Sequence, residues 1–362
     1  MLAPPSTTTT TPPTITGFLA QSASFVSADD GFVLGVVSCS TGTCLALRHT
    51  VDQGVSWTSL SAPPTTLGST DTTGVSGLHF ADALDGWAFG GTVWATHDGG
   101  QNWHAVNVGG PVVAMASGAG VAYALVEPCS SSPCSAPGHL YRSPVDEQSW
   151  TEVSGVSGQF DEGSWSLVAE GQTVFVLTPD PNPGILGSSD GIHFAPLTIP
   201  CSPETEYPGP ILPAALAASD PADVAVACLG GGAAGSQVKE AYISHDGGHT
   251  YARLPDPPME GDGAEVAMPA PTTVLLASSS GATLVYRQAP PDTSWTTPVD
   301  FGDGGVGVAD LGFVDPSHGA LIHGNATVAL SILSTPNPPS GLGTLYLTDD
   351  GGAHWRLIDV PA

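Results

Sequence analysis

Basic residues are scarce in this chain. Its 362 residues include 34 Asp and Glu against 6 Lys and Arg, which gives a formal net charge of −28. Phosphate groups on nucleic acids and anionic lipids are bound by Lys and Arg, so the deficit argues against a nucleic-acid partner. We interpret the acidic surface as a means of staying soluble in an acidic or salty medium, and a specific cationic partner is the alternative.

Long hydrophobic runs are lacking as well. No stretch of 18 apolar residues is present, so we expect no direct insertion into a membrane. No hydrophobic signal core precedes residues 1–16, which are rich in Thr and Pro and typical of a disordered, extended stalk. We interpret the chain as a mature or trimmed exported protein, extracellular or tethered to the cell envelope through an N-terminal segment that has been removed.

Cysteine is limited to six residues, which allow 15 disulfide connectivities. They fall into local pairs in polar loop sequence, and this context favours bridges between neighbours. Oxidised bridges imply an envelope or extracellular location. The expected pairs are Cys39/Cys44, Cys129/Cys134 and Cys201/Cys228.

Motifs for catalysis and cofactors are missing. There is no His-Glu-x-x-His and no Gly-x-Ser-x-Gly, and the glycine-rich run 230–235 lacks a following Lys-Ser/Thr, so we interpret that run as a flexible loop. Oxygen-bearing residues in 261–265 and 300–303 suit calcium, but neither segment is a complete calcium loop. We therefore expect no cofactor and no metal.

An aromatic residue recurs every 44 to 60 residues and mostly ends an eight-residue pattern, Ser/Thr-x-Asp-x-Gly-x-x-aromatic. The Asp is suited to accept hydrogen bonds from later backbone N–H groups and so close a turn. The Gly tolerates a positive φ. The aromatics are Trp57, Trp103, Trp150, Phe194, Tyr251, Trp295 and Trp355, and the turn aspartates are Asp52, Asp98, Asp190, Asp246 and Asp350.

Each repeat contains four short β runs separated by Gly/Asp turns. Seven such units predict an all-β fold, a seven-bladed β-propeller with four antiparallel strands per blade. After the stalk, residues 17–362 are expected to form this single domain. The predicted blades are 17–62, 74–108, 111–155, 164–199, 211–256, 264–299 and 306–361.

The eight-residue pattern resembles the Asp-box, or bacterial neuraminidase repeat, of sialidase-like propellers. The pattern is more similar to that of the photosystem II assembly and stability factors, which pair the box with an upstream strand pair, here 80–90. That resemblance implies a propeller with a scaffold or assembly role. Those factors share an arginine patch that this chain lacks, which argues against a photosynthetic client.

Sialidase chemistry needs three arginines around a substrate carboxylate. The five arginines here all lie near the box turns, so we expect no sialidase activity. A glycosidase with a pair of carboxylates stays open, because two suitably spaced acids suffice for that reaction.

Long loops and all six cysteines map to the face of the propeller opposite the boxes. Long loops on a rigid scaffold are where binding usually takes place. We expect a non-catalytic monomer that binds a protein or envelope component through this face, and a carbohydrate-active propeller is the alternative. The candidate binding residues are Asp161, Glu162, Trp165, Glu204, Glu206, Tyr207, Glu260, Asp262, Glu265, Asp300, Phe301 and Asp303.

Overall fold

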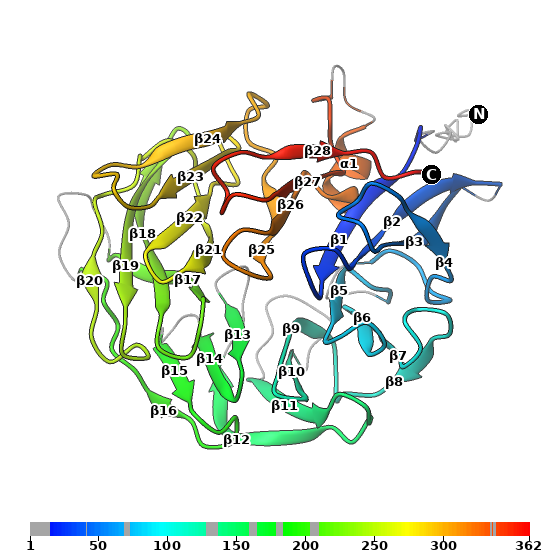
Figure 1. The fold of residues 1–362 in the computed structure, drawn as a ribbon, viewed down its shortest axis with the longest axis horizontal. Helices are drawn as coiled ribbons and strands as arrows, with labels where there is room; N and C mark the ends of the chain where they lie inside the picture. The colour runs from blue at the N-terminus through cyan, green and yellow to red at the C-terminus, as the bar shows by residue number, and fades with distance from the viewer. Residues whose placement is uncertain are drawn as a thin grey trace, which may run out of the picture.

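The computed structural model describes residues 15–40, 42–68, 73–127, 137–158, 165–178, 184–202, 210–333, 335 and 338–362. Seven four-stranded antiparallel sheets stand around a central opening, so the predicted all-β, seven-bladed propeller is confirmed (Figure 1). Each blade is built from four strands that are consecutive in the sequence, and the first strand of each blade lines the centre. Within the described residues, no helix is both long and apolar enough to cross a membrane.

The strands of blades one to four alternate short turns with longer connections. They are β1 Leu19–Phe25, β2 Gly31–Cys39, β3 Gly42–Thr50, β4 Thr58–Leu60; β5 Gly77–Phe80, β6 Gly86–Phe89, β7 Val93–Thr96, β8 His104–Val106; β9 Val112–Gly118, β10 Val121–Val126, β11 Gly138–Pro144, β12 Thr151–Gly158; β13 Ser166–Glu170, β14 Thr173–Thr178, β15 Gly184–Ser188 and β16 Ala195–Pro196.

Blades five to seven repeat the arrangement and include the helix. Their elements are β17 Leu212–Ala218, β18 Val224–Ala233, β19 Ser236–Ser244, β20 Ala252–Arg253; β21 Glu265–Ala270, β22 Thr273–Ala277, β23 Leu284–Gln288, β24 Thr296–Asp300; β25 Val308–Phe313, β26 Gly319–His323, α1 Ala326–Ile332, β27 Thr344–Thr348 and β28 Arg356–Ile358.

The hydrophobic core lies between the blades. Each pair of adjacent blades encloses one apolar cluster, and each cluster contains the box-position aromatic of one of its two blades. Burial of these large rings is a main source of stability. The repeated aromatic therefore fixes the packing of one blade on the next.

The glycine-rich run 230–235 was predicted to be a flexible loop, and this prediction is wrong. It extends β18 and β19 into a long hairpin whose turn residues, Ala234 and Gly235, both have positive φ. Such a two-residue turn matches the twist of paired strands. The α-carbon of Gly235 also lies against the backbone of Gly281, where an added Cβ would come within 3.1 Å.

The short helix α1 between β26 and β27 was not predicted from the repeat. Asn325 caps its N-terminus, because its side chain accepts a hydrogen bond from the N–H of Val328 at 3.1 Å. Ala326 is fully buried beside Ile15 and Val36. The helix thus lies where blade seven meets blade one (Figure 1). Ile15 was expected in the disordered stalk, and for this residue the expectation is wrong, because its side chain is buried in the cluster with Ala326; residues 1–14 lie outside the described residues.

Ring closure between those two blades involves no exchange of strands, because every sheet is made of consecutive strands. Side chains and single backbone contacts join the ends instead. The N–H of Ala20 donates to the carbonyl of Gly343 at 2.8 Å, and Thr327 donates twice to Gln21 Oε1 at 2.9 Å. Arg48 donates to the carbonyl of Pro361 at 2.9 Å.

Candidate functional site

The box turns have one hydrogen-bond pattern. In the second blade, Asp98 Oδ1 accepts from the hydroxyl of Thr96 at 2.9 Å and from the N–H of Asn102 at 2.9 Å. The N–H of Gly100 donates to the same Thr96 hydroxyl at 3.0 Å, and Gly100 has a φ of 80°. These contacts explain why the turn uses Thr, Asp and Gly at this spacing.

The same contacts recur at Asp52, Asp246 and Asp350, each with a positive-φ glycine two residues later. The hydroxyl and N–H of Thr250, together with the Ser244 hydroxyl, hold the pKa of Asp246 well below its usual range. A carboxylate committed in this way to its own turn serves stability rather than catalysis.

On the opposite face, five candidate binding residues and one cysteine pair lie outside the described residues: Asp161, Glu162, Glu204, Glu206, Tyr207, Cys129 and Cys134. Disulfides Cys39–Cys44 and Cys201–Cys228 are present, with Cα atoms 5.9 and 5.7 Å apart. The first closes the β2–β3 hairpin. The second joins the segment before blade five to β18.

Two candidate aromatics contribute to packing. Trp165 packs against the cluster between blades three and four. Phe301 stacks on His323 with ring centroids 3.8 Å apart. Neither ring is presented as an open platform for a sugar.

Asp303 was expected on an accessible surface, and for its side chain this expectation is wrong. Its carboxylate is 3% exposed and lies 2.6 Å from His323 Nε2, which is equally buried. Burial raises the pKa of Asp303, but hydrogen bonds led by the one with His323 outweigh burial and lower it below its ordinary value. The pair holds the segment before β25 against β26.

Glu260, Asp262 and Asp300 lie on the long-loop side of blades five and six, and Glu260 and Asp300 are exposed. Asp262 is half-buried; its N–H donates to the carbonyl of Ser280 at 2.7 Å, and its Oδ1 is shielded from solvent. Its backbone thus ties the segment after blade five to the β22–β23 turn.

Lys239, the single lysine of the chain, lies under this segment and was not predicted as a site residue. It is 4% exposed, and its Nζ donates to five backbone carbonyls, among them Met259 and Glu260 at 3.0 Å each. Burial lowers its pKa to about 8, against the opposing charges of Asp262 and Glu260, so the ammonium persists at neutral pH. The sequence signal that could have indicated this buried site is the adjacent pair Lys239 and Glu240 within an apolar strand.

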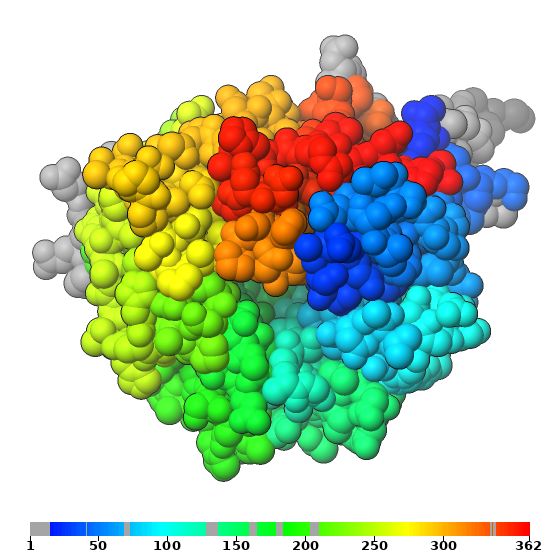
Figure 2. All heavy atoms as spheres, in the orientation of Figure 1, coloured from blue at the N-terminus to red at the C-terminus, as the bar shows by residue number. Residues whose placement is uncertain are grey.

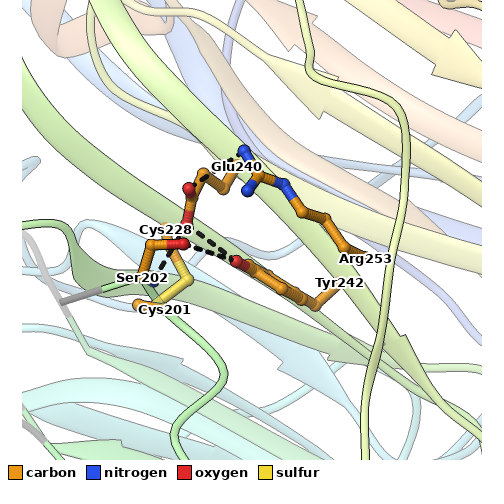
Figure 3. The surroundings of a disulfide bond; sticks show 6 residues. All are labelled: Cys201, Ser202, Cys228, Glu240, Tyr242 and Arg253. Atoms are coloured by element: carbon orange, nitrogen blue, oxygen red, sulfur yellow. Dashed lines mark hydrogen bonds and ion pairs between the residues drawn. A yellow bond between two sulfur atoms is a disulfide. The ribbon is translucent and has the colours of Figure 1, made fainter. Parts of the chain in front are cut away.

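Beside the Cys201–Cys228 disulfide, the carboxylate of Glu240 interacts with three residues (Figure 3). It accepts from the Ser202 N–H at 3.0 Å and the Tyr242 hydroxyl at 2.8 Å, and pairs with Arg253 at 3.0 Å. Burial raises the pKa of Glu240, but these donors outweigh burial and lower it. The side chain of Glu240 is 5% exposed, so the network fixes the disulfide loop on blade five and offers no open reaction site.

Four of the five arginines contact different neighbours. Arg48, Arg287 and Arg356 donate to the carbonyls of Pro361, Gly351 and Gln53, and Arg253 pairs with Glu240 and Asp256. Each is committed to its own neighbour at a blade edge or between two blades. This arrangement differs from the arginine cluster that sialidase chemistry requires.

Glu265 was expected on the binding face but lies partly buried at the start of β21, beside the central opening. Burial, and then the nearby charge of Asp310, raise the pKa of Glu265 to about 8. Leu311 donates its N–H to Glu265 Oε2 at 3.4 Å. The carboxyl is therefore mostly neutral at pH 7.

Comparisons with known proteins support the fold. No protein-family model and no curated protein matches the sequence. Among solved structures, "YCF48 bound to D1 peptide" is 18% identical, with a TM-score of 0.55, covering 86% of this chain and 89% of that one. An ancestral GH74 enzyme is 11% identical, with a TM-score of 0.54, covering 94% of this chain and 46% of that one.

The β-propeller domain of the Trilobed protease from Pyrococcus furiosus is 7% identical, with a TM-score of 0.54, and the match covers 95% and 96% of the two chains. That domain is described as having an open velcro topology. Similarity at these identities extends to the propeller fold alone.

Proposed function

We propose that this chain is an exported or envelope-tethered binding propeller that recognises a cationic protein segment and has no catalytic role. Binding would use the acidic loop surface, which we define as residues 259–263, 279–282 and 300–305. Formal net charge of −28 favours a partner of opposite charge and speeds its association.

One observation carries the proposal: the acidic loop surface is held in place by backbone contacts before any partner binds. Gly261 donates its N–H to the carbonyl of Gly235 at 2.8 Å, and Asp262 donates to Ser280 at 2.7 Å. Gly307 donates to the hydroxyl of Thr283 at 2.9 Å. Lys239 anchors the same segment from below. A preformed surface loses little conformational entropy on binding.

The composition of this surface also fits a protein partner. Glu260 and Asp300 are exposed, and Met259, which is 39% exposed, adds an adaptable apolar group beside them. The YCF48 structure contains a bound peptide, which supports protein recognition by a propeller of this shape. Two disulfides fit an oxidising location outside the cytoplasm.

A carbohydrate-active role is the second candidate, supported by the shared fold of the ancestral GH74 enzyme. A glycan site needs exposed aromatic rings beside acids. Of the candidate aromatics that the structure describes, Trp165 and Phe301 are engaged in packing. This observation favours the protein partner.

The test is an affinity pull-down from envelope extract with the wild type and the double variant Glu260→Gln/Asp300→Asn. A matched control, Asp146→Asn/Asp292→Asn, removes the same charge from exposed acids on the box side. We expect a protein that is retained by the wild type and the control but lost from the double variant. Its direct binding, measured with purified partner, should weaken as salt is raised.

Equal retention by all three proteins would refute the assignment of the surface. Retention on polysaccharide, with no protein partner, would instead favour the carbohydrate-active role.

A further inference from the structure

A cavity of about 350 Å³ lies on the box face, opposite the acidic loop surface, where blade seven meets blade one. It is formed by the ends of β1 and β25, the start of β26 and the last box turn, with β5 reaching in from blade two. Figure 2 shows the box face hollowed at its centre, between the β1–β2 and β25–β26 turns. Volumes of about 300–1,000 Å³ are typical of ligand pockets.

The wall of the cavity is aromatic on several sides. Phe25, Phe313 and Trp355 contribute to the lining, and Phe313 meets Trp355 edge-on with ring centroids 6.1 Å apart. His79 lies deeper, 2.8 Å from the Ser117 hydroxyl, and burial lowers its pKa to about 4, so this imidazole is neutral at pH 7. The lining thus offers the faces and edges of aromatic rings, and His79 of β5 adds no positive charge.

Two carboxylates face the cavity. Asp349 is exposed at the rim, beside the last box turn. Asp310 is exposed within the cavity although it belongs to an inner strand. It sits in a β-bulge of β25 with a φ of 54°, a conformation that non-glycine residues rarely adopt. Bulges of this kind re-aim a side chain, and strained residues cluster at ligand sites.

The Asp310 carboxylate is held in position. Its Oδ2 accepts the N–H of Ala23 at 2.7 Å, and Ser22 contributes a further hydrogen bond. These contacts come from blade one, so the carboxylate is fixed at the junction of the two blades. The basic groups of the lining already have partners: Arg356 donates to the carbonyl of Gln53, which also lines the cavity, and His318 and His354 lie against Asp315 and Asp350.

We propose that this cavity binds an organic cation on an apolar stem, a guanidinium or alkylammonium group, with Asp310 and Asp349 as its carboxylate partners and the aromatic wall against its stem. Aromatic faces and carboxylates together are what such cations require. An anionic ligand would meet two carboxylates and a strongly negative protein. The apolar stem of an organic cation would also use the aromatic wall, which a bare metal ion would leave without a partner.

The group can come from a peptide side chain or from a free amine, and two probes separate these sources. The first is the capped peptide acetyl-Gly-Arg-Gly-amide, and the second is agmatine. The neutral control is the same peptide with citrulline in place of arginine, which keeps the shape and removes the charge. Binding is measured by titration calorimetry and by NMR on the purified protein.

We expect the arginine peptide or agmatine to bind, and citrulline to weaken peptide binding by about tenfold or more, as for loss of one charge-assisted contact. Asp310→Asn and Asp349→Asn should each weaken binding. Asn at 310 still offers an oxygen to Ala23, and a thermal melt checks folding. Asp359→Asn, an exposed acid outside the lining, should bind as the wild type does.

Peptide binding without agmatine binding would identify a side chain as the occupant, and the reverse would identify a free amine. Absence of binding by both probes, equal binding of the arginine and citrulline peptides, or wild-type affinity in both Asp310→Asn and Asp349→Asn would overturn the proposal. The double variant Glu260→Gln/Asp300→Asn should keep full affinity for these probes, so this site and the proposed function can fail independently.

Discussion

At the scale of single residues, aspartates and glutamates have two roles set by their surroundings. Box aspartates are surrounded by donors from their own turn, as Asp98 is by Thr96 and Asn102, and they remain ionised. Glu265 lies near Asp310 beside the central opening, where burial, and then the charge of Asp310, favour the neutral form of Glu265. An ionised carboxylate therefore stabilises the box turns at the surface, whereas a buried carboxyl makes the fold less stable as pH rises.

Alanine at Asp98 should destabilise the fold without affecting the acidic loop surface. The substitution leaves the N–H groups of Gln101 and Asn102 without their acceptor, at a cost on the order of 1–3 kcal/mol. Urea unfolding of Asp98→Ala measures the loss, with Asp146→Ala as the control. Loss of partner binding in a folded Asp98→Ala protein would contradict the assignment of the binding face.

Replacing Glu265 with Gln should remove a pH-dependent loss of stability. The pKa of Glu265 rises from 4.5 to about 8 on folding. A raised pKa stabilises the fold fully below the unfolded value, and this contribution is lost as pH rises through the folded value. The loss is about 1.4 kcal/mol per pKa unit.

Thermal unfolding between pH 5 and pH 9 tests this, since the wild type should lose more stability than Glu265→Gln over this range. Gln keeps an acceptor for the Leu311 N–H. Glu260→Gln, an exposed glutamate, is the control and should follow the wild type. Parallel pH profiles for the wild type and Glu265→Gln would contradict the prediction.

At the scale of elements, loops on the long-loop face are stabilised by different means. The β18–β19 hairpin has a two-residue turn, the segment 259–263 has Lys239 beneath it, and the loop ending at Ser202 has a disulfide and Glu240. The hairpin is held by its own strand pairing, whereas the other two segments lie outside the blade strands. Their combined effect is a firm surface for binding.

The two described disulfides should contribute different amounts to the free energy of unfolding. Cys201–Cys228 closes a chain segment of 27 residues and Cys39–Cys44 one of 5, so loop entropy predicts that the first contributes about 1–2 kcal/mol more. Cys228 is also fully buried, which adds a packing loss. Urea unfolding of the double variants Cys201→Ala/Cys228→Ala and Cys39→Ala/Cys44→Ala compares them directly, and equal losses would contradict the ranking.

At the scale of the whole molecule, the ring is closed by side chains where blade seven meets blade one. Among the described strands none crosses this junction, whose polar contacts include Gln21 with Thr327 and Asp310 with Ala23. The apolar cluster between these blades resembles the other six in kind. Cooperativity between the chain ends therefore depends on a few identifiable contacts.

Removing the Gln21 side chain should loosen this junction. In Gln21→Ala, hydrogen exchange is expected to accelerate in β1 and β28 together, because both strands pack into the cluster that the junction encloses. Ser166→Ala removes a contact to Leu216 between blades four and five and serves as the control. Exchange that rises equally around the ring in Gln21→Ala would show that the junction is no weaker than the other blade contacts.

The sequence repeat predicted the architecture because each unit contains the residues that form its own turn and its own contact with a neighbouring blade. The Thr/Ser, Asp, Gly and aromatic positions of a box specify a turn and an interblade anchor within eight residues, and these interactions are mostly local. Seven copies then predict seven blades. The spacing and loop context of Cys39, Cys44, Cys201 and Cys228 likewise predicted the two bridges found among the described residues.

Tertiary structure alone decided where the carboxylates lie relative to solvent and to one another. Asp303 and Asp300 are three residues apart, yet one is buried against His323 and the other is exposed. Lys239, Glu240 and Asp310 acquire their partners from loops and blades distant in sequence, as does the cavity between the first and last blades. Such contacts depend on how the ring closes, which no single repeat encodes.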